Sequence, residues 1–115
     1  MLLKVDLQSS QPLHEQLAGQ LRKHIADGHF KRGERLPPAR SLASSLGVNV
    51  HTLLRALQTL RDEGLVEMRR GRGTLVTGLA PKFARFAGLA QKLVLEARRA
   101  GLADGEIRKL IEVQL

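Results

Sequence analysis

The sequence predicts a mainly α-helical fold with one small β-hairpin, followed by a hairpin of two helices. Apolar residues recur at spacings of three and four along most of the chain, which is the period of buried helical faces. The period becomes strand-like over residues 65–77, where a turn rich in Arg and Gly separates two short apolar runs. With 115 residues, the chain is expected to form one domain over residues 1–78 and an appendage over residues 79–115.

A positive charge extends over the whole chain and limits the classes of partner. Nineteen Lys and Arg against eleven Asp and Glu give a net charge of +8, divided as +5 over residues 1–78 and +3 over residues 79–115. Such a charge attracts polyanions, which include nucleic acids and anionic membrane surfaces. The only aromatic residues are three Phe, so few side chains can stack on single-stranded bases. The composition therefore favours duplex DNA.

Several other classes of protein are disfavoured. The chain has no Cys, which excludes disulfides and thiolate metal sites. It has no long apolar run and no signal-peptide pattern at the N-terminus, so we predict no membrane span and a cytoplasmic location. The four His lack tight ligand spacing, although His24 and His29 are expected to approach each other around a helix end in a structural role. No residue pattern sets up a nucleophile, so we predict neither an enzyme nor a cofactor.

The N-terminal segment is expected to be a short strand or extended arm, followed by a helix. Leu3, Val5 and Leu7 alternate with polar residues. Pro12 opens the helix and Gly28 ends it. Its buried stripe recurs at every fourth position, through Leu13, Leu17, Leu21 and Ile25. Phe30 is expected to fold back onto this stripe, residues 31–34 to form a turn, and residues 35–36 a brief extended segment.

Two short helices near the middle of the chain resemble a helix-turn-helix. The first begins at Pro38, since Pro suits the first helical position, and Gly47 ends it in the left-handed conformation. Asn49 caps the second helix, which closes at Gly64. The narrow core stripe of this second helix consists of Leu53, Ala56, Leu57 and Leu60. Two short helices joined by a turn that contains Gly are typical of the motif, and an ordinary helical hairpin is the alternative.

The opposite face of the second helix favours the DNA-binding interpretation. At 100° per residue, His51, Arg55 and Gln58 point away from the core. All three side chains can hydrogen-bond a base edge or a phosphate, and in helix-turn-helix proteins the start of this helix enters the major groove. A polar outer face is also what any solvated helix shows.

The predicted hairpin follows directly, in the position of a wing. Its apolar runs cover residues 65–68 and 74–77, and its tip carries Arg69, Arg70 and Arg72 among glycines. A solvated loop is the simple explanation of such a charge run. We favour a contact with DNA, because glycines let the backbone approach the sugar-phosphate chain closely and the tip lies beside the recognition helix.

The last 37 residues are expected to form two helices that pair with a second copy of the chain. Pro81 marks the boundary, a long helix runs from about residue 82 to residue 100, and Gly101 ends it with an apolar contact from Leu102. Asp104 is expected to cap the last helix. The predicted dimerisation residues are Phe83, Phe86, Ala90, Leu93, Ala97, Ile107, Leu110 and Ile111. Because these helices are too short to cover their own apolar faces, a two-fold dimer and a palindromic operator follow.

These motifs together resemble the winged helix-turn-helix regulators of the GntR family. The matching segments are residues 12–16, 33–37, 42–43, 46–48, 56–57, 60, 63–65 and 70–74. The short helical tail is similar to the YtrA-like subgroup, whose members dimerise through two C-terminal helices. The resemblance implies a dimeric, sequence-specific transcription regulator of double-stranded DNA, by analogy a repressor, with no indication of an effector.

The resemblance also implies which residues contact DNA. These are Arg40, Asn49, Val50, His51, Thr52, Leu54, Arg55, Arg70, Gly71 and Arg72. Many members have Arg where this chain has Val50 and Leu54, and we expect one of these two apolar residues to contact a thymine methyl group. The alternatives are an architectural DNA-binding protein of weak specificity and a winged-helix adaptor that binds proteins.

Overall fold

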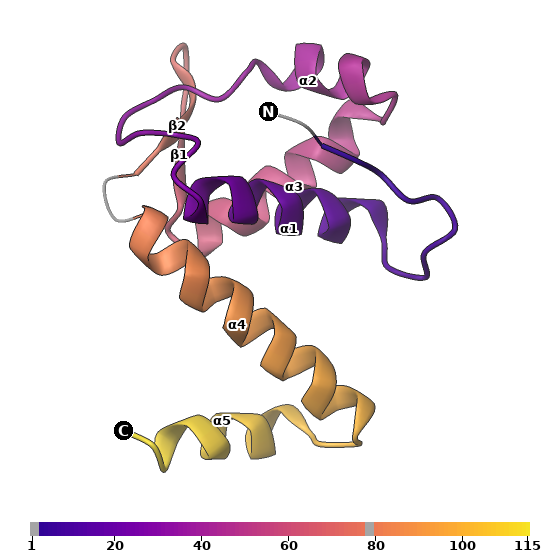
Figure 1. The fold of residues 1–115 in the computed structure, drawn as a ribbon, viewed down its shortest axis with the longest axis vertical. Helices are drawn as coiled ribbons and strands as arrows, with labels where there is room; N and C mark the ends of the chain where they lie inside the picture. Colours follow the sequence, from indigo (N-terminus) through magenta and orange to yellow (C-terminus); the bar gives the residue numbers. More distant parts are fainter. Residues whose placement is uncertain (1–2, 78–79) are drawn as a thin grey trace.

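The predicted fold class is confirmed: the chain is mainly helical, with one antiparallel hairpin. The computed structural model describes residues 3–77 and 80–115, with only the backbone for residues 80–82. Its elements are α1 (Leu13–Ala26), α2 (Ala39–Leu46), α3 (Val50–Asp62), β1 (Val66–Arg69), β2 (Gly73–Val76), α4 (Ala80–Arg99) and α5 (Asp104–Glu112). Figure 1 shows α1, α2, α3 and the hairpin gathered at one end, with α4 leading away to α5 at the other.

The hydrophobic core lies where the two predicted stripes meet. Leu17, Leu21 and Ile25 of α1 are fully buried, and so are Leu53, Ala56 and Leu60 of α3. Phe30 returns to the same core, as its position after the end of α1 predicts. Since apolar burial contributes roughly 25 cal/mol per Å² of surface, this contact between α1 and α3 stabilises the domain.

The N-terminal segment is an extended arm rather than a strand. Leu3 is buried and Val5 packs against the core, whereas Leu7 is exposed. Of the three alternating apolar residues, only the first two therefore face the core. Side chains of α1 hold the arm. The Lys4 N–H donates to Gln20 Oε1 at 2.6 Å, the Gln20 amide donates back to the Lys4 carbonyl, and the Asp6 N–H donates to Gln16 Oε1 at 2.8 Å. Glutamine side chains thus replace the pairing that a strand would need.

The turn between α2 and α3 has the predicted construction. Gly47 follows α2 with a φ of 69°, a conformation that a residue with a Cβ rarely adopts. Asn49 caps α3, its Oδ1 accepting the His51 N–H at 2.8 Å. One detail differs from the expectation: Pro38 directly precedes α2 and is not its first helical residue. Pro12 holds the same position before α1.

The hairpin carries a third, partly paired segment along its edge. β1 and β2 pair antiparallel from Val66 opposite Val76 to Arg69 opposite Gly73. Residues 33–36 pair with the free side of β2, where the Gly33 N–H donates to the Val76 carbonyl and the Leu36 N–H to the Thr74 carbonyl, both at 2.8 Å. The brief extended segment of the sequence therefore belongs to the wing, which we define as residues 32–36 and 66–76.

The start of the tail differs from the expectation. α4 begins at Ala80 and contains Pro81 in its first turn, where Pro is tolerated because the first helical N–H groups have no intrahelical partner. Residues 78 and 79, where the predicted domain meets the predicted tail, lie outside the described residues. Ala84 of α4 is buried in the main core, and a Cβ on Gly88 would lie 3.5 Å from the Arg22 side chain. The first half of α4 therefore packs on α1, and the division at residue 78 stays a prediction.

The turn from α4 to α5 is formed by Gly101, as predicted. Gly101 has a φ of 92°, and the Leu102 N–H donates to the Ala97 carbonyl at 3.0 Å. The expected cap at Asp104 is wrong, because Ala103 is the residue that precedes α5. Its N–H donates to Glu106 Oε1 at 2.9 Å, while Asp104 forms an ion pair with Arg98 at 3.1 Å.

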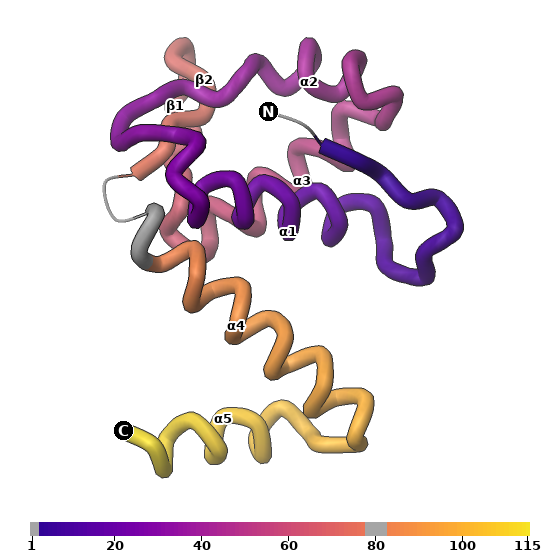
Figure 2. The backbone as a smooth tube through the Cα atoms, viewed as in Figure 1, coloured from indigo at the N-terminus to yellow at the C-terminus, as the bar shows by residue number. Residues whose placement is uncertain are grey.

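Two of the predicted dimerisation residues are already buried in the single chain. Ala97 and Ile107 are 8% and 5% exposed, near the contact of α4 with α5. The other six stay accessible in this chain: Phe83, Phe86, Ala90, Leu93, Leu110 and Ile111. Figure 2 shows that α5 lies far from the hairpin, with α4 as the connection. No helix in the described part of the chain is long and apolar enough to cross a membrane.

Candidate nucleic-acid interface

The outer face of α3 is polar and exposed. His51, Arg55 and Gln58 are all exposed, while the opposite stripe is fully buried, which confirms the helix phase read from the sequence. Asn49 is also exposed, although its side chain already caps the helix. The Thr59 hydroxyl donates to the Arg55 backbone carbonyl at 3.3 Å, a bond that does not involve the Arg55 guanidinium. The exposed side chains of His51, Arg55 and Gln58 are therefore accessible to another molecule.

Three of the expected contact residues on α3 are only half-accessible. Val50, Thr52 and Leu54 are half-buried, and both Val50 and Leu54 pack against the core. Leu54 also lines a cleft of about 320 Å³ that Ala39 of α2 and Met68 of β1 share. The side chain thus fills space between α3, α2 and the wing, and less of it can meet a thymine methyl group than the sequence pattern implied.

The tip of the wing presents two arginines on a turn that depends on glycine. Arg70 and Arg72 are exposed, and the Arg72 N–H closes the turn by donating to the Arg69 carbonyl at 3.1 Å. Gly71 and Gly73 have φ values of 79° and 77°. A residue with a Cβ at either position would be strained, so the tip requires these two glycines.

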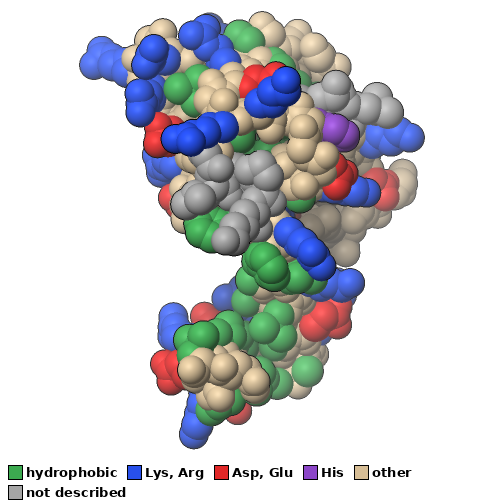
Figure 3. Space-filling view, turned by 60° about the vertical axis from the view of Figure 1, so that its left-hand side comes forward, with side chains coloured by type: hydrophobic (Ala, Val, Ile, Leu, Met, Phe, Trp, Pro, Cys, Tyr) green, Lys and Arg blue, Asp and Glu red, His purple; other side chains and the backbone are tan. Residues whose placement is uncertain are grey.

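The helix-turn-helix and the wing tip lie at the same end of the molecule. Figure 1 shows α2 and the tip of the hairpin at the end opposite to α5. Arg40 is exposed at the start of α2 and adds a cation to this end. Figure 3 shows Lys and Arg side chains gathered over the end of the molecule that carries the hairpin. The arrangement combines a polar helical face with exposed cations, which suits a groove with phosphates on both sides.

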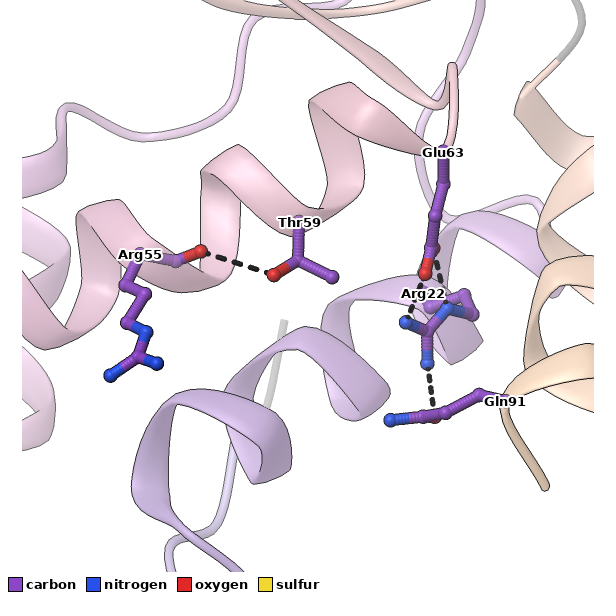
Figure 4. Close-up of polar contacts among 5 residues, drawn as sticks. All are labelled: Arg22, Arg55, Thr59, Glu63 and Gln91. Atoms are coloured by element: carbon purple, nitrogen blue, oxygen red, sulfur yellow. Dashed lines mark hydrogen bonds and ion pairs between the residues drawn. The ribbon is translucent and has the colours of Figure 1, made fainter. Parts of the chain in front are cut away.

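A buried polar cluster at the other end of α3 was not foreseen from the sequence. Arg22 of α1 donates from Nε to Glu63 Oε1 at 2.8 Å and from Nη2 to Glu63 Oε2 at 2.7 Å. Its Nη1 donates to Gln91 Oε1 of α4 at 2.8 Å, as Figure 4 shows. Glu63 is the residue that ends α3. The cluster therefore fixes the end of the exposed helix to α1 and to the tail.

The predicted proximity of two histidines is confirmed. The Nδ1 atoms of His24 and His29 lie 2.6 Å apart, and the ring centroids 4.9 Å apart. Within residues 3–77 and 80–115, no group of three or more His, Cys, Asp or Glu side chains is placed to hold a metal ion.

The exposed helix, the wing and the basic surface define a winged-helix DNA-binding regulator. The family described as bacterial regulatory proteins, gntR family, matches residues 13–76, which is more than half of the chain. The chain therefore belongs to the GntR family of transcriptional regulators, whose members bind DNA.

Individual relatives agree over nearly the whole chain. This chain is 32% identical over 117 residues to the HTH-type transcriptional repressor YtrA of Bacillus subtilis. The matched region covers 96% of this chain and 88% of that protein. The solved structure of YtrA from Sulfolobus acidocaldarius, a GntR-family transcription factor, is 34% identical with a TM-score of 0.64 and covers 82% of this chain and 99% of that one. These similarities confirm the YtrA-like resemblance, tail included.

A third similarity includes a bound operator. The structure of the AraR DNA-binding domain in complex with operator ORX1 is 26% identical, with a TM-score of 0.61, and covers 67% of this chain and 99% of that one. The shared fold therefore extends to a protein whose structure was solved on DNA.

Proposed function

We propose that this GntR-family regulator is a dimeric repressor that reads a roughly palindromic operator. The observation that carries the proposal is the exposed face of α3, which carries His51 and Arg55, together with an exposed wing tip that carries Arg70 and Arg72. In helix-turn-helix proteins the start of this helix lies in the major groove, and Arg side chains there recognise base edges. Repression is inferred from the YtrA relative, which is named a repressor.

The remaining contact residues have roles that follow from their positions and burial. Arg40 and the wing residues Arg70, Gly71 and Arg72 position the protein on the phosphates, which adds affinity without reading sequence. Asn49 and Thr52 lie at the start of α3, where backbone and bases are both within reach. Val50 and Leu54 contribute mainly by packing, because both side chains are half-buried against the core.

The dimer is proposed from the exposed apolar surface of the tail. Phe86 is 58% exposed, Leu93 41% and Leu110 46%, so these apolar side chains of α4 and α5 are not covered by the described part of the chain. Scattered exposed Leu residues are common, but an apolar row along one helix is typical of an interface. A two-fold axis through the tails relates the two α3 helices, and half-sites then lie about one helical turn of DNA apart, or a multiple of that.

Selection of bound sites from random duplex DNA at two salt concentrations tests the proposal. We expect a two-fold symmetric consensus, a complex of two chains per site, and repression of a reporter that carries the selected site. Equal binding to selected and random duplex would instead indicate the architectural protein of weak specificity. Binding to a protein partner that is insensitive to salt, without any binding to DNA, would indicate the adaptor.

A further inference from the structure

The wing has a second basic surface, on the side that faces away from α3. Residues alternate between the two faces of a strand, so Val66 and Met68 face inward while Glu67 and Arg69 face outward, as their burial shows. Arg35 pairs with Leu75, and Leu75 pairs with Glu67, which places the three side chains in one row on this outward side. The outer face of the wing is defined here by Arg32, Arg35, Glu67, Arg69, Arg72 and Leu75.

This outer face is an open hollow rimmed by arginines. The hollow has a volume of about 570 Å³ and lies on the opposite side of the hairpin from the cleft that Leu54 lines. Arg35 lies next to the start of β2, since a Cβ on Gly73 would be in ordinary van der Waals contact with Arg35 Cδ, at 3.8 Å. The exposed Arg35 side chain is thus close to the turn that carries the wing tip.

The charges of the outer face are not balanced within the chain. Glu67 is the single carboxylate on it and pairs with Arg69 at 3.0 Å. Among residues 3–77 and 80–115, Arg32, Arg35 and Arg72 form no ion pair. Three unpaired cations in one hollow form a site for an extended polyanion, because Arg binds phosphate oxygens in a two-point geometry.

We propose that the outer face of the wing is a second DNA-binding surface, which holds backbone phosphates that flank each half-site. The proposal rests on the DNA-binding function proposed for this chain. It adds where the outer face of the wing meets the duplex and what this contact does to affinity. With α3 in a major groove, the side of the wing turned away from α3 lies over duplex beyond the base pairs that α3 reads. Arg32 and Arg35 bind there without reading sequence, so the length of the duplex, and not only its consensus, determines affinity.

The test compares two duplexes that carry the selected site, one trimmed to its consensus and one extended by roughly one helical turn on each side. We expect the wild-type chain to bind the extended duplex more tightly. We also expect the plot of log affinity against log salt to be steeper for it, by about 0.9 for each arginine engaged. The variant Arg35→Gln, alone and combined with Arg32→Gln, should lose most of this advantage and bind the trimmed duplex as the wild type does.

The control variant is Arg61→Gln, which removes the same charge from the last turn of α3. Its guanidinium is exposed and lies 3.6 Å from Asp62, a surface pair of little energetic value. It should keep the full advantage of the extended duplex. Circular dichroism and thermal unfolding of each variant show whether the fold is intact. Because Arg32 lies in an exposed turn, Arg32→Gln alone still tests the flanking contact even if Arg35→Gln unfolds.

The outcomes separate this proposal from the one it rests on. Equal wild-type affinity for trimmed and extended duplexes overturns the flanking contact, while sequence-specific binding of the trimmed duplex leaves the regulator function intact. An equal loss on both duplexes in Arg35→Gln places the contact inside the half-site and also overturns the proposal. Binding to phosphatidylserine vesicles that requires Arg35, with no effect of duplex length, assigns the outer face to a membrane surface instead.

Discussion

Arg22 and Glu63 form a two-point ion pair that fixes the end of α3 to α1. Two nitrogens of the Arg22 guanidinium lie 2.8 and 2.7 Å from the two oxygens of Glu63. The burial of the partners is unequal, with the Arg22 side chain 4% exposed and the Glu63 side chain 23% exposed. The energetic cost of removing each partner therefore differs.

We expect Glu63→Ala to destabilise the domain more than Arg22→Met. The first variant leaves a buried guanidinium with Gln91 as its remaining side-chain partner, which costs about 3–5 kcal/mol in free energy of unfolding. The second leaves a carboxylate that water can reach, and Met keeps the apolar stem, so the cost is about 1–2 kcal/mol. Urea unfolding of the two variants measures the difference, and the reverse order would show that solvent reaches the guanidinium.

The bond from Arg22 to Gln91 connects the same cluster to the tail. Gln91→Leu removes it, and we expect a loss of about 1 kcal/mol in stability and looser control of the angle between α3 and α4. If the tails form the dimer, this variant should tolerate operators whose half-sites are moved apart by one or two base pairs better than the wild type does. Gln91→Glu keeps an acceptor for Arg22 and should restore the wild-type preference, whereas unchanged spacing preference in Gln91→Leu would contradict the coupling.

The features that the sequence predicts correctly are those stabilised by interactions between residues close together in the chain. The stripe from Leu53 to Leu60, the cap at Asn49 and the turn at Gly47 depend on neighbours in the sequence, and the structure confirms all three. The pairing of residues 33–36 with β2 and the contact of Arg22 with Glu63 join segments about 40 residues apart. No local pattern indicates which segments meet at that separation.

One error concerns a residue with more than one suitable role. Asp104 has the residue type of a helix cap, but the carboxylate of Glu106 serves the N-terminus of α5 and Asp104 binds Arg98. At Asp104 the three-dimensional neighbours decide between roles that the sequence allows equally. The DNA contact expected of Val50 and Leu54 stays a prediction, although both side chains are half-buried against the core.

The wing tip should affect affinity rather than specificity. Arg70→Ala removes one exposed cation that we place on a phosphate, so affinity should fall by similar factors on operator and random duplex, and the salt dependence should flatten by about one counterion. Arg72→Ala should act in the same direction. Filter binding or fluorescence anisotropy over a range of salt measures both effects, and unchanged affinity in both variants would place the tip outside the interface.

The recognition helix should affect specificity. Because His51 and Arg55 are exposed and hold no part of the core, His51→Ala and Arg55→Ala should leave thermal stability nearly unchanged. Each should reduce the discrimination between operator and random duplex by roughly 1–3 kcal/mol, the value of a good base contact. Competition binding against random duplex measures the discrimination. Gln11→Ala, an exposed polar position before α1, serves as the control and should bind as the wild type does.

The last prediction concerns the tail, where Leu93 is the residue best placed to test the dimer. It is 41% exposed in the single chain and does not belong to the buried core, so its replacement leaves the winged domain folded. In a dimer joined by the exposed apolar row of α4, Leu93→Glu places a carboxylate without a partner in the interface, and its desolvation costs several kcal/mol. We expect the variant to sediment as a monomer, to retain the wild-type circular dichroism spectrum per residue, and to bind a half-site only weakly.

The matched control is Leu95→Glu, since Leu95 is 43% exposed but two residues away, about 200° around the helix from Leu93. A wild-type chain that is monomeric at micromolar concentration and binds its operator as a monomer would contradict the two-fold arrangement. Loss of the dimer in Leu95→Glu but not in Leu93→Glu would place the interface on the opposite side of α4.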